Sequence, residues 1–186
     1  ESGLEAAIKQ QASRGCLIFG ICGGYQMLGE ILRDTLALEG GGTTVGLGLL
    51  PVETVFQPEK QRRQISGVLL PCSLQQEAGI PVNGYEIHMG NTTLHDGAQP
   101  FLQLEFHQDG CWQDRVYGTY LHGIFDSDAF RQQLLRMLYQ KKGIQPEQHN
   151  RLSWQAYREQ QYDKLADAVR ENLDLSVIYQ ILEEGL

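Results

Sequence analysis

Two segments of the sequence contain residue types that could perform covalent chemistry. In the first, the apolar run Cys16–Ile21 ends at Cys22, which lies between Gly20 and Gly24 and precedes a helix-like segment. A sharp strand-to-helix turn exposes such a cysteine for attack, and the glycines leave room for a backbone that a Cβ would obstruct. The helix N-terminus would favour a thiolate, and the Gly23 N–H would be free to stabilise an oxyanion. We therefore predict that Cys22 is a nucleophile with half of an oxyanion hole beside it.

The second segment, Val116–Asp126, reads as a strand that ends in His122 beside a glycine. A histidine at a strand end can reach across a cleft, and it lies about a hundred residues after Cys22, so the fold must bring the two together. Taken singly, each residue has a plainer interpretation. A lone cysteine in an apolar run is usually a small core residue, and a single histidine is usually a loop residue without a partner. Together they favour a nucleophile and its general base.

The two segments resemble the class I glutamine amidotransferases, and most closely the C-terminal glutaminase domain of the cobyric acid synthase family of cobalamin biosynthesis. The segment Gly84–Gly90, which reads Gly-Tyr-Glu-Ile-His-Met-Gly, narrows the resemblance to the branch that amidates corrins. The likeness runs through nearly the whole chain, in the segments Gly20–Gly29, Gly46–Thr54, Gly84–Gly90, Gly118–Asp126 and Tyr162–Arg170.

The resemblance implies an α/β fold of the class I glutamine amidotransferase type. This is a three-layer, flavodoxin-like sheet with antiparallel additions, formed by residues 1–186 as a single domain. It also implies that the N-terminal strands, and a Gly-rich loop with the second oxyanion N–H, lie upstream of Glu1. We therefore expect the chain to be an N-terminally truncated fragment of a larger synthase.

The resemblance also assigns roles within the site. Cys22 would attack the glutamine amide, His122 would move the proton, Gly23 would stabilise the oxyanion, and Gly24 and Gln26 would help to bind glutamine. Many class I members carry a glutamate two residues after the catalytic histidine, whereas this chain has Ile124. A dyad is the simplest interpretation, and Glu86 or a backbone carbonyl could orient His122 instead.

The implied larger reaction involves partners outside this chain. Ammonia would pass to an ATP- and Mg²⁺-dependent synthetase domain of the same parent polypeptide, which would amidate corrin carboxylates of adenosyl-cobyrinic acid a,c-diamide to give cobyric acid. This chain itself is expected to hold no metal and no cofactor. The alternatives are a glutaminase of cobyrinic acid diamide synthase or of peptidoglycan amidation, a cysteine protease or other hydrolase, and a catalytically silent module that binds or regulates a synthetase.

Composition excludes several other classes of function. The chain has 186 residues and a net charge of −8, so it offers no basic surface for nucleic acid. Its four cysteines form no Cys-x-x-Cys pair, and no signal peptide or membrane-spanning run is visible, which favours the cytoplasm and reduced thiols. The dispersed histidines suggest no metal site, and we expect His95, His107 and His149 to be solvent-exposed or core residues.

Hydrophobic periodicity predicts the elements that position these residues. In the segment Val82–Met89, Tyr85 and Ile87 face one way and Glu86 and His88 the other. The glycine-rich segment Gly40–Thr44 reads as a loop, without the Gly-Lys-Ser/Thr of a phosphate loop. Helices are predicted at Leu4–Ala12, Tyr25–Leu32, Ser127–Gln140, Ser153–Asn172 and Ser176–Glu184, and strands at Leu17–Ile21, Val45–Phe56, Ile65–Leu70, Val82–Met89, Phe101–Phe106 and Val116–Leu121.

Overall fold

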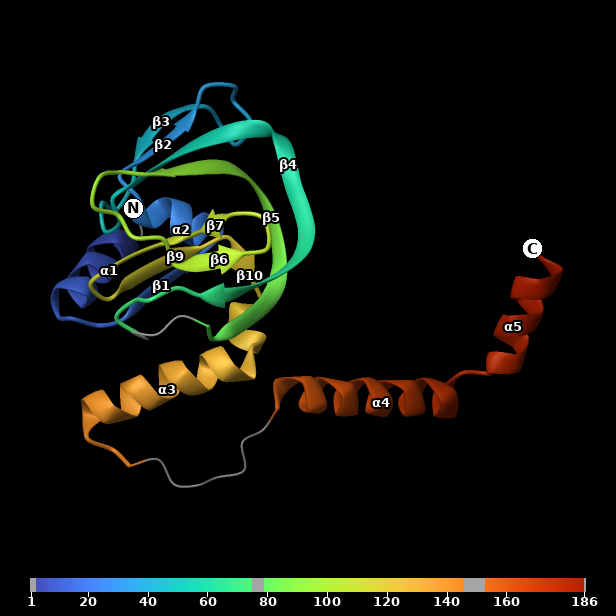
Figure 1. The fold of residues 1–186 in the computed structure, drawn as a ribbon. Coiled ribbons are helices and arrows are strands. Elements are labelled where there is room, and N and C mark those ends of the chain that lie inside the picture. The colour runs from blue at the N-terminus through green and yellow to red at the C-terminus, as the bar shows by residue number, and fades with distance from the viewer. Residues whose placement is uncertain (1–2, 75–78, 146–152, 186) are drawn as a thin grey trace. The chain divides into compact units, whose positions relative to one another are not determined.

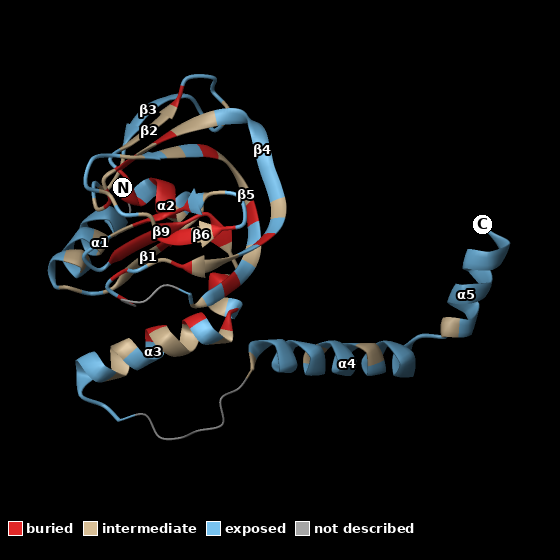
Figure 2. Ribbon diagram, viewed as in Figure 1, coloured by how far each residue is buried: buried red, intermediate tan, exposed pale blue. Residues whose placement is uncertain are grey.

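The computed structural model describes residues 3–74, 79–145 and 153–185, and it divides the chain into two compact units, residues 1–145 and 146–186 (Figure 1). The second unit contains helices α4 (Trp154–Asn172) and α5 (Leu175–Glu184), both close to their predicted bounds. No described residue of either helix is buried (Figure 2). The sequence predicts one domain over residues 1–186, and the structure groups these residues into two compact units.

The first unit contains the site and all of the strands that the structure describes. Its helices are α1 (Leu4–Ser13), α2 (Gly23–Leu28) and α3 (Asp128–Lys142), with a short 3₁₀ turn at Ile124–Asp126. The strands are β1 (Ile18–Ile21), β2 (Ile31–Asp34), β3 (Gly42–Val45), β4 (Val52–Leu69), β5 (Pro81–Leu94), β6 (Leu102–Leu104), β7 (Gln108–Asp109), β8 (Cys111–Gln113), β9 (Val116–Thr119) and β10 (Leu121–His122).

A small three-stranded sheet with the order β1-β9-β8 carries the cysteine turn. Strands β1 and β9 run parallel, with Ile21 opposite Thr119, as the continuous apolar run of β1 predicts. All four residues of β9 are buried, because it is the central strand. In β1 only Gly20 is buried, since β1 lies at the edge of this sheet among the described strands.

The second sheet has the order β10-β5-β4-β2-β3 and is dominated by the long antiparallel pair β4 and β5. The sequence predicts two strands in place of β4, because the polar run 57–64 shows no alternation. The backbone of that run nevertheless pairs with β5, apart from a bulge between Phe56 and Gln61. Pro58 lies in this bulge, where a residue without an N–H breaks no ladder bond.

Helix α2 is shorter than predicted. It ends at Leu28, because Gly29 adopts an extended conformation, and the predicted last turn becomes part of β2. The predicted loop Gly40–Thr44 likewise contributes to β3, which pairs with β2. The Ser127 hydroxyl caps α3, because it accepts the N–H of Phe130. Across the described residues, no helix combines the length and apolarity needed to cross a lipid bilayer.

Two apolar clusters cover the two faces of the small sheet. Consecutive residues of β9 point into different clusters: Val116 packs with Tyr25 and Leu28 of α2, and Tyr117 packs with Phe101 and other residues of the second cluster. The second cluster joins both sheets and helix α3, through ring contacts between residues such as Phe19 and Phe130. This layering, with helices outside and strands between, confirms the predicted α/β fold class. The antiparallel additions contain more of the strands than the parallel part does.

Candidate active site

Cys22 lies at the turn between β1 and α2 in a backbone conformation that few non-glycine residues adopt. Its φ is 54° and its ψ is −114°. Residues persist in such sparsely populated regions only where the surrounding structure over-determines their conformation. They cluster at functional sites. Gly20 makes the turn possible, since a Cβ there would lie 2.7 Å from the Gly24 backbone and 2.6 Å from Leu28. The nucleophile turn predicted from the sequence is therefore present.

The steric requirement predicted at Gly24 itself is wrong. A Cβ built on Gly24 or on Gly23 would meet no atom within 4 Å. Both residues lie in the first turn of α2, directly after Cys22. The space beside the Cβ positions of both residues is therefore open.

Backbone and side-chain hydrogen bonds hold Cys22 against two other strands. Its N–H donates to the carbonyl of Thr119 at the end of β9, over 2.9 Å. Its thiol donates to the carbonyl of Ile87 in β5, with 3.4 Å between sulfur and oxygen. The sulfur therefore lies beside β5, at the edge where β10 begins its pairing.

His122 reaches the same part of β5 from the other sheet. One residue, Tyr120, separates β9 from β10, and His122 then pairs with Tyr85 of β5 in antiparallel register. The imidazole stacks on the Tyr85 ring, with centroids 4.9 Å apart and planes within 2° of parallel. Its Nε2 is buried and has no hydrogen-bond partner among the described residues.

The strand β5 thus brings the two predicted groups together. The Cys22 sulfur contacts the carbonyl of Ile87, and the His122 ring contacts the side chain of Tyr85, two residues earlier on the same strand. Two residues along a strand span about 7 Å, so the two contacts lie about that far apart along β5. Cys22 and His122 thus share β5 as a neighbour, while the thiol itself donates to the Ile87 carbonyl and not to the imidazole.

The environment of the sulfur favours the neutral thiol. Burial raises the pKa of the Cys22 thiol above its usual value, and the hydrogen bond from the Gly23 N–H lowers it only in part. The thiol also donates to a carbonyl oxygen, an arrangement that only the protonated form can make. The sequence predicts the opposite direction from the helix dipole, but burial outweighs it. Cys22 therefore needs a base to become a nucleophile.

Gln26 lies behind the turn and not on its open side. It is buried, and its Nε2 donates to the Tyr120 hydroxyl over 3.2 Å. That hydroxyl is also hydrogen-bonded to Thr92 of β5 over 2.7 Å, and Thr92 to Thr54 of β4. The amide of Gln26 is thus engaged in tying α2 to the second sheet, whereas the sequence-based hypothesis gives it a role in binding glutamine.

Glu86 has other partners than His122. It is fully buried and accepts hydrogen bonds from Arg63 Nε at 2.6 Å and from His107 Nε2 at 3.0 Å, while His88 Nε2 lies 3.9 Å away. Burial alone would raise the pKa of this carboxyl, but interactions with His88 and Arg63 outweigh it and lower the pKa to about 2.

Glu86 also lies on the wrong face of the sheet to orient the imidazole. It pairs with Leu121, whereas His122 pairs with Tyr85, and successive residues of a strand face opposite ways. The suggestion that Glu86 orients His122 is therefore not supported. Position 124 supplies no carboxylate either, since Ile124 is fully buried in the apolar core.

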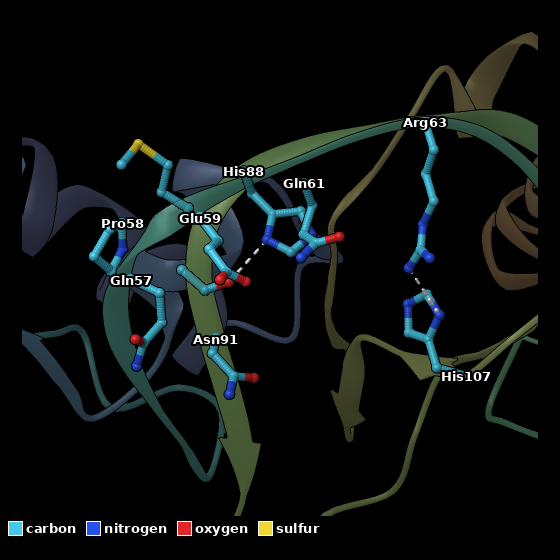
Figure 3. Close-up of a pocket in the computed structure, with 10 residues that line it drawn as sticks. Gln57, Pro58, Glu59, Gln61, Arg63, His88, Asn91 and His107 are labelled. Atoms are coloured by element: carbon cyan, nitrogen blue, oxygen red, sulfur yellow. Dashed lines mark hydrogen bonds between the residues drawn. The ribbon is translucent and has the colours of Figure 1, made fainter.

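A cavity of about 600 Å³ lies beside this ionic cluster (Figure 3). Its lining comes from the β4 bulge and from the cluster itself, and includes Gln57, Glu59, Gln61, Arg63, His88 and His107. Neither Cys22 nor His122 lines it. Sequence analysis missed Arg63 and His107, because the signal that joins them to Glu86 is the pairing of distant strands.

The remaining histidines have ordinary roles or lie outside the description. His95 pairs with Glu30, with 3.0 Å between Nδ1 and Oε2, and His149 lies outside the described residues. The prediction that His107 is merely an exposed or core residue is wrong, since it binds Glu86. Within residues 3–74, 79–145 and 153–185, no three His, Cys, Asp or Glu side chains are grouped to hold a metal ion.

Comparison with known proteins gives a consistent set of relatives. Residues 1–130 match the family of CobB/CobQ-like glutamine amidotransferase domains. The chain is 45% identical to a cobyric acid synthase of Lachnoclostridium phytofermentans, over 100% of this chain and 39% of that protein. It is 44% identical to a cobyric acid synthase of Klebsiella pneumoniae, over 99% of this chain and 38% of that protein. It thus spans about two-fifths of the length of these relatives.

The fold is also found among solved structures. The structure of PurLQS from Thermotoga maritima matches with a TM-score of 0.53 and 17% identity, over 73% of this chain and 68% of that one. At this level of identity the match is a likeness of fold alone.

Proposed function

The chain belongs to the family of CobB/CobQ-like glutamine amidotransferase domains, and we propose that Cys22 and His122 carry out the hydrolysis of glutamine in it. The observation that supports this most directly is that Cys22 and His122 both contact one short stretch of β5, with Cys22 in a strained turn. The buried Nε2 of His122, which has no hydrogen-bond partner among the residues that the structure describes, adds to it, because a general base needs a free nitrogen.

The proposed reaction begins with proton transfer. His122 takes the proton of the Cys22 thiol, which burial keeps protonated at rest, and the resulting thiolate attacks the side-chain amide carbon of glutamine. The C=O bond opens to an oxyanion, and the Gly23 N–H donates to it. His122 then returns the proton to the leaving nitrogen, so that ammonia departs and a thioester remains. Water hydrolyses the thioester to glutamate and restores the thiol.

The open space beside Gly23 and Gly24 is where we place the substrate amide. A side chain at either position would enter that space. Gln26 contributes through its hydrogen bond to Tyr120, which fixes the turn against β5.

We propose further that the ammonia serves an ATP- and Mg²⁺-dependent synthetase region of a longer protein. The names of the relatives, cobyric acid synthases, support amidation of corrin carboxylates, with adenosyl-cobyrinic acid a,c-diamide converted to cobyric acid. ATP, Mg²⁺ and the corrin would bind that region and not this chain.

Replacement of the proposed nucleophile tests the reaction. Cys22→Ala should reduce glutamate release from glutamine to background, while Cys16→Ala, at an exposed cysteine, should leave it unchanged. In the longer protein, Cys22→Ala should retain amidation driven by free ammonia. Loss of that activity as well would show that Cys22 is structural, and wild-type glutamate release from Cys22→Ala would refute the proposal.

His122→Asn should lower kcat about 100-fold or more, the usual contribution of a positioned general base. His95→Asn serves as the matched control, because His95 pairs with Glu30 at the surface. A silent module would release no glutamate in any of these forms, and a protease would cleave peptides but not free glutamine.

A further inference from the structure

The ring of Tyr85 covers the imidazole that the proposed reaction uses. The two rings are stacked, with planes within 2° of parallel and centroids 4.9 Å apart. The backbone sets this contact, because Tyr85 and His122 are directly opposite each other in the antiparallel pair of β5 and β10. Side chains at such positions face the same side of the sheet with Cβ atoms about 5 Å apart.

No carboxylate orients the imidazole within the described residues. Position 124 is a buried isoleucine, and Glu86 lies on the opposite face with Arg63 and His107. The Nε2 of His122 makes no hydrogen bond there. A base without an orienting partner can rotate about its side-chain torsions, and misplacement of a reacting group by about 1 Å can cost about 100-fold in rate.

Tyr85 does not belong to either apolar cluster of the core. Its side chain is 44% exposed, which is unusual for an aromatic residue inside a long strand. Its hydroxyl makes no hydrogen bond to another described residue. The side chain of Tyr85 therefore contributes to the structure mainly through the stacking of its ring on His122.

We propose that Tyr85 is a positioning residue for His122, whose aromatic ring fixes the plane of the imidazole in the way that an orienting carboxylate does by hydrogen bonding elsewhere. This inference rests on the proposed function of His122. The flat contact restrains rotation of the imidazole about its side-chain torsions.

The test compares Tyr85→Leu with Tyr85→Phe in the intact protein, with glutamate release as the assay. Tyr85→Leu removes the flat ring and should lower kcat about 10- to 100-fold, while KM stays within about twofold. Tyr85→Phe keeps the ring and should retain kcat within about twofold. Phe106→Leu, at an aromatic side chain that is 74% exposed, is the matched control for loss of a surface ring and should behave as wild type.

A spectroscopic readout separates positioning from loss of structure. In NMR spectra of protein with labelled histidine, the His122 ring protons should show the ring-current shift of the stack in wild type and in Tyr85→Phe, and lose it in Tyr85→Leu. If Tyr85→Leu does not fold, Tyr85→Met replaces it, since an unbranched side chain fills similar space without a flat face.

The outcomes distinguish the two proposals. Wild-type kcat in Tyr85→Leu, alongside an inactive His122→Asn, would overturn the positioning role and leave the proposed function intact. A loss in Tyr85→Phe as large as in Tyr85→Leu would also overturn it, because the hydroxyl would then be the active group. Full activity in His122→Asn would overturn the proposed function, and the role of Tyr85 with it.

Discussion

Glu86 should make the stability of the first unit sensitive to acid. Its carboxyl is fully buried, and its pKa falls from 4.5 to about 2 in the folded protein, where burial opposes the interactions with His88 and Arg63 that lower it. Each pKa unit corresponds to about 1.4 kcal/mol, so ionised Glu86 stabilises the folded state by about 3 kcal/mol at neutral pH. That is a large part of the 5–15 kcal/mol or so that holds a typical domain together.

The direction of the pH effect follows from the lowered pKa. The stabilisation is fully present above about pH 4.5, where the carboxyl is ionised in both states, and it is lost as the pH falls toward 2. At pH 3.5 about 1.4 kcal/mol of it should already be gone, because the unfolded state binds the proton first. Glutamine at this position does not ionise and has no such loss.

The assay is urea unfolding of wild type and Glu86→Gln between pH 6 and pH 3.5. Wild type should be the more stable at pH 6, and its advantage in unfolding free energy should shrink by about 1.4 kcal/mol at pH 3.5. Glu59→Gln, at an exposed glutamate of the same long hairpin, is the matched control and should parallel wild type. A constant difference between wild type and Glu86→Gln across this range would refute the ionic cluster described for Glu86.

Three further predictions concern the turn and its supports. Gly20→Ala should lower the free energy of unfolding, measured in urea, by about 1–3 kcal/mol, because its Cβ would lie 2.7 Å from the Gly24 backbone. An unchanged midpoint of urea unfolding would show that α2 can move away. In His122→Asn, half-maximal alkylation of Cys22 by iodoacetamide should require a pH above that for free cysteine, because burial raises the pKa of the thiol; a lower pH would contradict that environment. Asp109→Ala should cost about 1–3 kcal/mol and increase amide exchange at Tyr120, since a buried carboxyl oxygen of Asp109 accepts that N–H at 3.1 Å. Unchanged exchange would show that this hydrogen bond does not protect the amide.

The parts of the site that the sequence predicts are those with a local signal. The turn at Cys22 follows from glycines at fixed offsets around a cysteine, after an apolar run. The start of α3 follows from Ser127, whose hydroxyl accepts an N–H three residues later. Such features are set by residues close together along the chain. They can therefore be predicted without knowledge of the contacts between distant segments.

The parts that sequence analysis missed depend on contacts between distant segments. Arg63 reaches Glu86 only because β4 and β5 pair in a register that includes the bulge near Pro58. The stack of Tyr85 on His122 requires a pairing between strands that no local pattern records. The direction of the pKa of Cys22 also depends on burial by remote residues, which a helix-dipole argument does not contain.

The passage of the chain between sheets at Tyr120 has a consequence for catalysis. The sulfur is attached to the smaller sheet and the imidazole to the larger one, so no single sheet determines how far apart they are. The two sheets are joined by an aromatic layer in which Phe19, Phe101 and Phe130 meet, as well as by the contacts of both groups with β5. Under the proposed function, a side chain trimmed in that layer should therefore lower glutamate release without touching Cys22 or His122.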